Sequence, residues 1–257
     1  MTPTIAFRVT HAPWSAARRA LLLQLRQRLG PVGAPHSFAV IEDTQRQGCW
    51  PTVRATWISG AMTTATHVLA MQDDIHPCPA FIPALEILIG MRPDVPLALW
   101  TTRPQIEQID GAWMACPGGS SGGGVVLPRA MAEDFIRWND RYLPGRSDVH
   151  LLDDSRLGWY IMARGLTTYY PVPGLMNHYG VKSLLGHNTK SHLMQPRRFI
   201  GLDGDPLAID WTRGFTDPPT APVGRTAPIL KTLHPRILVE SGLARAYPAL
   251  AAVTRSS

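Results

Sequence analysis

Short apolar runs alternate with longer amphipathic segments along the first 185 residues of the chain. The runs have the length and composition of buried strands, and the segments between them repeat apolar residues every three or four positions, as one face of a helix does. The predicted strands are residues 4–10, 37–41, 66–72, 95–101, 125–127 and 167–171, and the predicted helices are 14–29, 51–62, 79–90, 128–138 and 156–164. This alternation predicts an α/β domain over residues 1–185, with a mostly parallel sheet flanked by helices.

The pattern changes in residues 186–257, which are rich in Pro, Gly and Arg and lack a clear period before about residues 229–243. We predict that they form a C-terminal extension that packs on the domain or reaches a partner. Residues 182–257 also hold 10 of the 25 basic residues but only 5 of the 19 acidic ones. A basic tail favours an anionic partner such as nucleic acid or a membrane surface, although an ordinary solvated tail has the same composition.

The overall composition is that of a globular protein, because 45% of the residues are hydrophobic and 17% are charged. Cys49, Cys78 and Cys116 are too few and too far apart for a disulfide framework or a zinc motif, which favours a reducing compartment. No apolar run approaches the roughly 18–20 residues of a membrane span, and no secretory leader is evident. We therefore expect a cytoplasmic protein without a membrane span, of undetermined oligomeric state.

Two adjacent carboxylates, Asp73 and Asp74, follow the apolar strand at 66–72, and Pro77 then ends the extended run. Burying carboxylates where a strand leaves the core costs several kcal/mol unless a cation meets them. In open α/β sheets this end of the strands is also where ligands bind. The stretch is therefore either a divalent-metal site that serves a phosphorylated substrate or a solvated Asp-Asp turn.

Two further stretches carry candidate chemistry. The glycine-rich segment 116–124 matches neither the P-loop nor the dinucleotide-binding fingerprint, so it is either a loop that closes over a ligand or a plain flexible connection. Asp153 and Asp154 stand before the helix at 156–164, where Asp is a favoured cap. One cap needs only one carboxylate, so the other could act as a general base.

The sequences LAMQDDIHP (69–77) and PGLMNHYGVKSLLGHN (173–188) resemble, together with the other features, the GT-A class of nucleotide-sugar glycosyltransferases. The resemblance covers roughly residues 4–188 and implies a GT-A-like (Rossmann-like) fold. It implies that Asp74 and His178 hold Mn²⁺ or Mg²⁺ on the donor diphosphate, with Asp73 beside the ribose or sugar. Gln72 departs from the family pattern, since it stands where a strict Asp-x-Asp motif has its first carboxylate.

The resemblance also implies a direct displacement, with inversion at the anomeric carbon. In inverting members of the class, an acidic residue that begins a helix near the acceptor is the general base, which matches Asp154 first and Asp153 second. The donor would be a UDP-sugar or another nucleoside-diphosphate sugar. Arg54 and Lys182 are candidates to neutralise its diphosphate. The end of the first strand and the end of the second would lie near the nucleotide base, at Thr10, His11, Glu42 and Asp43.

The acceptor is less constrained. A small enzyme with a basic tail resembles phage-type glycosyltransferases that modify hydroxymethylated bases in DNA, which would place it in the host cytoplasm. Double-stranded DNA is then the first acceptor hypothesis, and a saccharide or protein hydroxyl is the alternative. The residues assigned to phosphate contacts are Lys190, Arg197, Arg198 and Arg213, followed by Arg225, Lys231 and Arg236. The rival classes are a nucleotidyltransferase, which would carry a basic glycine-rich loop after the first strand, and a non-enzymatic nucleic-acid-binding protein.

Overall fold

The computed structural model describes residues 2–119, 123–143, 153–178, 196–221 and 235–246. Its helices are α1 (Ala16–Leu29), α2 (Cys49–Ala61), α3 (Phe81–Met91), α4 (Arg129–Tyr142), α5 (Asp153–Ala163), α7 (Pro235–Glu240) and α8 (Leu243–Ala246), with 3-10 turns η1 (Pro104–Gln108) and η3 (Pro206–Ala208). Its strands are β1 (Ile5–His11), β2 (Ser37–Glu42), β3 (His67–Gln72), β4 (Ile75–Pro77), β5 (Leu97–Ala98), β6 (Trp113–Pro117), β7 (Gly124–Pro128), β8 (Thr167–Pro171) and β9 (Met176–His178).

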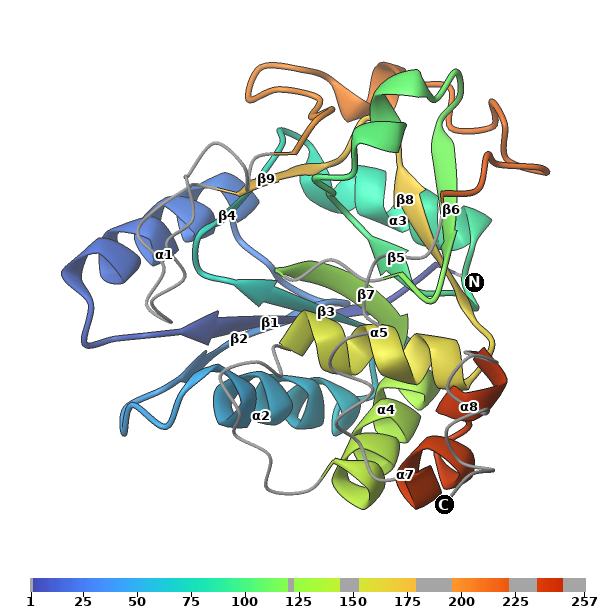
Figure 1. The fold of residues 1–257 in the computed structure, drawn as a ribbon. Coiled ribbons are helices and arrows are strands. Elements are labelled where there is room, and N and C mark those ends of the chain that lie inside the picture. The colour runs from blue at the N-terminus through green and yellow to red at the C-terminus, as the bar shows by residue number, and fades with distance from the viewer. Residues whose placement is uncertain (1, 120–122, 144–152, 179–195, 222–234, 247–257) are drawn as a thin grey trace.

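Seven strands form one sheet in the order β2-β1-β3-β7-β5-β8-β6, and β4 pairs with β9 in a separate small sheet (Figure 1). Strands β1, β2, β3, β5 and β8 run in one direction, whereas β6 and β7 run against their neighbours. The predicted α/β layout with a mostly parallel sheet and flanking helices is confirmed.

Helices cover both faces of the sheet, and the alternation along β1 shows why. Ile5, Phe7 and Val9 belong to the apolar cluster that includes α1 and α3. Arg8 and Thr10 point to the other face, where they bond Ser59 and Thr56 of α2 at 3.0 and 3.2 Å. Because side chains alternate between the two faces of a strand, every second residue of β1 faces α1 and α3, and the residues between them face α2.

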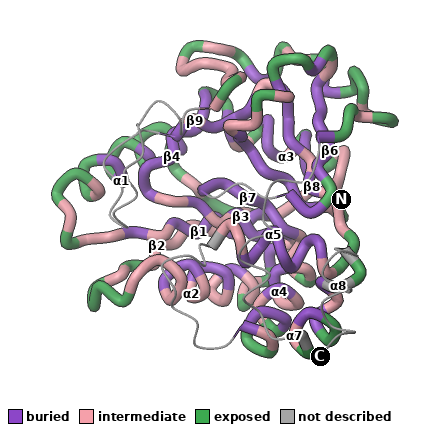
Figure 2. The backbone as a smooth tube through the Cα atoms, in the orientation of Figure 1, coloured by how far each residue is buried: buried purple, intermediate pink, exposed green. Residues whose placement is uncertain are grey.

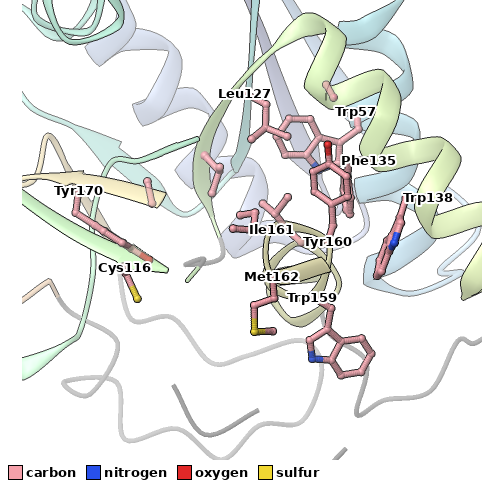
Figure 3. Close-up of a cluster of buried hydrophobic side chains, with 14 of the residues drawn as sticks. Trp57, Cys116, Leu127, Phe135, Trp138, Trp159, Tyr160, Ile161, Met162 and Tyr170 are labelled. Carbon is pink, nitrogen blue, oxygen red and sulfur yellow. The ribbon is translucent and has the colours of Figure 1, made fainter. Parts of the chain in front are cut away.

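The second layer, formed by α2, α4 and α5, is built around aromatic side chains. Phe135 of α4 packs against Trp57 of α2 and Tyr160 of α5, with ring centroids 5.9 and 5.3 Å away (Figure 3). The buried residues are concentrated in the sheet and on the inner sides of these helices (Figure 2). This packing fixes α5, whose first turn carries the predicted base.

Several elements differ from the predicted pattern. The strand expected at 95–101 shortens to β5: the Leu99 amide still donates to the Gly124 carbonyl in register with β7, but the Leu99 carbonyl accepts from the Leu175 amide of another segment. Strands β4 and β6 were not predicted, since each has its partner far away in sequence. A period returns in the sequence only at about residues 229–243. Of these, 229–234 lie outside the described part, and Gly242, with a φ of 88°, separates α7 from α8.

The described C-terminal segments pack on the rest of the fold. Residues 196–221 run beside the edge of the sheet, with isolated bridges from Phe199 to Gly174 and from Thr220 to Ala115 (Figure 1). Trp211 is buried against Trp113, whose indole N–H donates to the Trp211 carbonyl at 2.7 Å. Among the described helices, none has the length and apolar composition needed to cross a membrane.

Candidate active site

The two adjacent carboxylates leave the carboxyl end of β3 and are almost fully buried. Asp73 and Asp74 are each 2% exposed, although they belong to a two-residue turn between β3 and β4. Because β1 and β3 are parallel and Thr10 is the register partner of Gln72, His11 lies beside Asp73. A solvated Asp-Asp turn is therefore wrong, and the carboxylates need cationic or hydrogen-bonding partners.

Asp73 is held by the segment that joins β1 to α1. Its Oδ2 atom is 2.7 Å from Nδ1 of His11 and accepts from the Ala12 amide at 3.3 Å. Its Oδ1 atom accepts from Nη1 of Arg18 at 2.6 Å. The sequence placed His11 and Asp73 on the donor site separately, and the structure brings them into direct contact.

Arg18 is the cation that meets both carboxylates. Its Nη1 atom lies 2.6 Å from Oδ1 of Asp73 and 2.6 Å from Oδ2 of Asp74, and its side chain is 13% exposed. Sequence reasoning required a cation here but did not identify it, because Arg18 looks like any polar residue of α1. One signal was available: a helix that follows a parallel strand begins at the carboxyl edge of the sheet, and Arg18 is in its first turn.

Asp74 also meets His178, although the two residues are far apart in sequence. Ile75 of β4 is the register partner of His178 in β9, which places Nε2 of His178 3.3 Å from Oδ2 of Asp74. The imidazole stacks on Trp100, with centroids 5.3 Å apart and planes at 23°. Burial raises the pKa of Asp74, but the hydrogen bond with His178 and the charges of Arg18 and His178 outweigh it and hold that pKa below its usual value.

The Asp74–His178 pair suits a divalent metal that takes its other ligands from a substrate. Within the described residues, no group of three or more His, Cys, Asp or Glu side chains is arranged around a metal position. Oδ1 of Asp74 and Nδ1 of His178 are buried and make no hydrogen bond there either. One carboxylate and one imidazole fit Mn²⁺ or Mg²⁺, which commonly bind through one or two protein carboxylates plus phosphate oxygens and water.

Asp154 lies on the other side of the β3 end. Gln72 points away from Asp73, as alternation along a strand requires, and lines a pocket with Asp154, Thr10, Trp57 and other residues of β3, β7 and α5. Oδ1 of Asp154 accepts from the Ser155 amide at 2.7 Å, and Asp153 is the first residue of α5. A carboxylate in this pocket can accept a proton from a hydroxyl group bound there.

The remaining predicted donor residues have other partners or lie outside the described part. Thr10 bonds Thr56, and Asp43 accepts from the amides of Gln47 and Gly48, so it shapes the loop after β2. Glu42 and Asp43 line a second pocket with residues of α2. Arg54 forms a two-point ion pair with Asp140 of α4, at 2.8 and 2.5 Å. Lys182, Lys190, Arg225 and Lys231 lie outside the described residues.

Three of the basic residues assigned to DNA contacts hold the C-terminal segment to the domain. Arg197 pairs with Glu107 at 3.3 Å, Arg198 donates to the Ile109 carbonyl at 2.7 Å, and Arg213 pairs with Asp110. Part of the glycine-rich segment, residues 120–122, also lies outside the described residues. At Gly118, with a φ of 62°, a Cβ atom would fall 1.9 Å from the Met162 side chain, so close packing against α5 explains this glycine.

Comparisons with known proteins add a structural likeness only. No protein family and no curated protein sequence matches the chain. Among solved structures, it is similar to the crystal structure of GalNAc-T7 with UDP, GalNAc and Mn²⁺, at 8% sequence identity and a TM-score of 0.48. The similarity covers 75% of this chain and 47% of that one, so the chain spans about half the length of its structural neighbour.

Proposed function

We propose that the protein is a metal-dependent glycosyltransferase of the GT-A type, which moves a sugar from a nucleoside-diphosphate sugar to an acceptor hydroxyl. The observation that carries the proposal is the meeting of Asp74 with His178 at the carboxyl end of β3, 3.3 Å apart. These are the two residues that the sequence resemblance assigned to the metal. A UDP-sugar is the first donor to test.

In this proposal the residues of the chain bind, orient and accept a proton. Asp74 and His178 would hold Mn²⁺ or Mg²⁺, and the metal, when bound, supplies positive charge that stabilises the leaving diphosphate. Asp73, fixed by His11 and Arg18, would orient the ribose or sugar. Asp154 would take the proton of the acceptor hydroxyl as that oxygen attacks the anomeric carbon, with inversion, and Asp153 is the second candidate base.

The acceptor hypothesis remains a hydroxymethylated pyrimidine in double-stranded DNA, as in phage DNA-modifying enzymes, with a saccharide or protein hydroxyl as the alternative. Its support is the net charge of residues 182–257. The contacts of Arg197, Arg198 and Arg213 with the domain reduce the charge that those residues can offer to phosphates. Binding that falls steeply with salt would support DNA. Salt-independent turnover on free sugars would exclude it.

Thermal unfolding with a panel of UDP, GDP, CDP and their sugars, each with and without Mn²⁺, tests the proposed activity. We expect a rise in melting temperature with one nucleoside diphosphate that depends on the metal, because a ligand that binds only the folded state stabilises it. Release of the nucleoside diphosphate from the matching sugar nucleotide then identifies the donor. If no nucleotide raises the melting temperature, a non-enzymatic nucleic-acid-binding protein becomes the better reading.

A further inference from the structure

Arg18 occupies the place where the metal would be expected to act. Its Nη1 atom is 2.6 Å from Oδ2 of Asp74, the same oxygen that lies 3.3 Å from Nε2 of His178. The neighbouring Arg19 is exposed and reaches only the Pro13 carbonyl, and Arg26 of the same helix is exposed over the Phe38 ring. Of these three arginines of α1, only Arg18 turns inward to a carboxylate pair.

A divalent metal bound to Asp74 would lie close to the Arg18 guanidinium in the arrangement described. A guanidinium so close to the Asp74–His178 pair repels a second cation, and repulsion is strong where the groups are shielded from water. The carboxylates nevertheless need a counter-cation when no metal is bound, since both are 2% exposed. Arg18 fulfils that need in the metal-free protein.

We propose that Arg18 is an internal counter-cation that competes with the metal for Asp74 and passes to the donor diphosphate when metal and nucleotide bind together. This inference rests on the proposed function. The planar guanidinium suits phosphate oxygens as well as carboxylates, so the diphosphate offers Arg18 a new anionic partner after displacement. When the metal binds without the diphosphate, Arg18 loses Asp74 and gains no new anionic partner, so metal binding alone is less favourable. The metal and the nucleoside diphosphate therefore bind cooperatively, and Arg18 is the residue that couples them.

The experiment measures Mn²⁺ binding directly, by electron paramagnetic resonance or calorimetry, with and without UDP or whichever diphosphate the panel selects. Arg18→Met removes the charge at similar length, and Arg19→Met is the matched control on the same helix. We expect Arg18→Met to bind Mn²⁺ alone about tenfold or more tightly than the wild type, because one repelling charge is lost. The strengthening of Mn²⁺ binding by the diphosphate should shrink in Arg18→Met and stay unchanged in Arg19→Met.

Thermal unfolding gives a second readout that does not depend on activity. Arg18→Met leaves two buried carboxylates without their cation, so it should unfold at a lower temperature than the wild type and recover more of that loss on addition of Mn²⁺. If Arg18→Met cannot be purified, Arg18→Gln, which is neutral but still donates a hydrogen bond, is measured in its place with the same expectation.

The outcomes separate this inference from the proposed function. If the wild type binds Mn²⁺ with the diphosphate, but Arg18→Met and Arg18→Gln bind Mn²⁺ no more tightly than the wild type, the competition is disproved and the transferase proposal stands. If neither the wild type nor the variants bind Mn²⁺ under any condition, both fail. The inference is supported if the Arg18 variants, but not Arg19→Met, bind Mn²⁺ more tightly than the wild type and show a smaller strengthening of Mn²⁺ binding by the diphosphate.

Discussion

Nε2 of His178 lies 3.3 Å from Oδ2 of Asp74 because β4 and β9 pair with Ile75 opposite His178. If the pair holds the metal, Asp74→Asn and His178→Ala should each remove most of the Mn²⁺-dependent rise in melting temperature with the nucleoside diphosphate. Thermal unfolding of each variant with the diphosphate, with and without Mn²⁺, measures this rise. Asp140→Asn, in an exposed ion pair with Arg54, is the matched control and should keep the rise. A full response in Asp74→Asn would contradict the metal assignment.

Asp154→Asn should abolish sugar transfer without weakening donor binding. A positioned general base contributes about 10²–10⁴-fold to a rate, so kcat should fall by that order. The measurement pairs turnover with the thermal response to the donor. Asp153→Asn is the companion variant and should retain most activity. The reverse result, with Asp153→Asn inactive and Asp154→Asn active, would move the base to Asp153.

The stack between Trp100 and His178 predicts that Trp100 orients the imidazole. Trp100→Leu should weaken Mn²⁺ binding in the presence of the diphosphate by about two- to tenfold, the equivalent of an aromatic pair, while Trp100→Phe should restore most of it. Trp113→Leu, which removes another buried indole, should lower stability and leave Mn²⁺ binding unchanged. Equal Mn²⁺ affinity in Trp100→Leu and Trp100→Phe would show that the stack does not orient His178.

Gly174 should not tolerate a side chain. A Cβ atom there would lie 2.9 Å from the Leu99 carbonyl oxygen and 3.3 Å from that of Arg198, both in the backbone. We expect Gly174→Ala to cost about 1–3 kcal/mol of unfolding free energy, measured by denaturant titration. Gly90→Ala is the control, because a Cβ atom at Gly90 meets nothing within 4 Å and alanine is the better helix former. If Gly174→Ala left the unfolding free energy unchanged, the backbone at Gly174 would not be as close to the Leu99 and Arg198 carbonyls as described.

The ion pairs and hydrogen bonds of Asp134 predict that its contribution to folding stability falls in acid. Burial raises its pKa, but hydrogen bonds from Arg164 and Tyr160 outweigh burial and hold the pKa below 3.8. Because the folded-state pKa is the lower one, the contribution to stability is present above about pH 4 and is lost as the pH falls through the folded value. Asp134→Asn should cost about 1 kcal/mol or less at pH 7, and the difference in unfolding free energy should shrink at pH 3, as measured by denaturant titration at both pH values. A difference that grows toward pH 3 would contradict this sign.

Local patterns were enough to predict most of the elements. The apolar alternation of β1 and the three-and-four spacing of α1 depend only on which side chains face the core, and burial of a face is a property of the segment itself. The same holds for the carboxylates after β3. An apolar strand that ends in Asp73 and Asp74 predicts that burial of these charges is costly, even before their partners are known. The length expected for the strand at 95–101 was wrong, because the Leu99 carbonyl accepts from the Leu175 amide, and local patterns contain no sign of that distant partner.

The sequence alone therefore predicts the α/β alternation and a strand that ends in two carboxylates, which need a cation if they are buried. The structure was needed to show that the cation is Arg18, that His178 contacts Asp74 because β4 pairs with β9, and that Arg54 forms its ion pair with Asp140. The physical reason is that a charged side chain on a helix surface looks the same whichever neighbour it faces. Strand order and register choose the neighbour, and they depend on the whole chain.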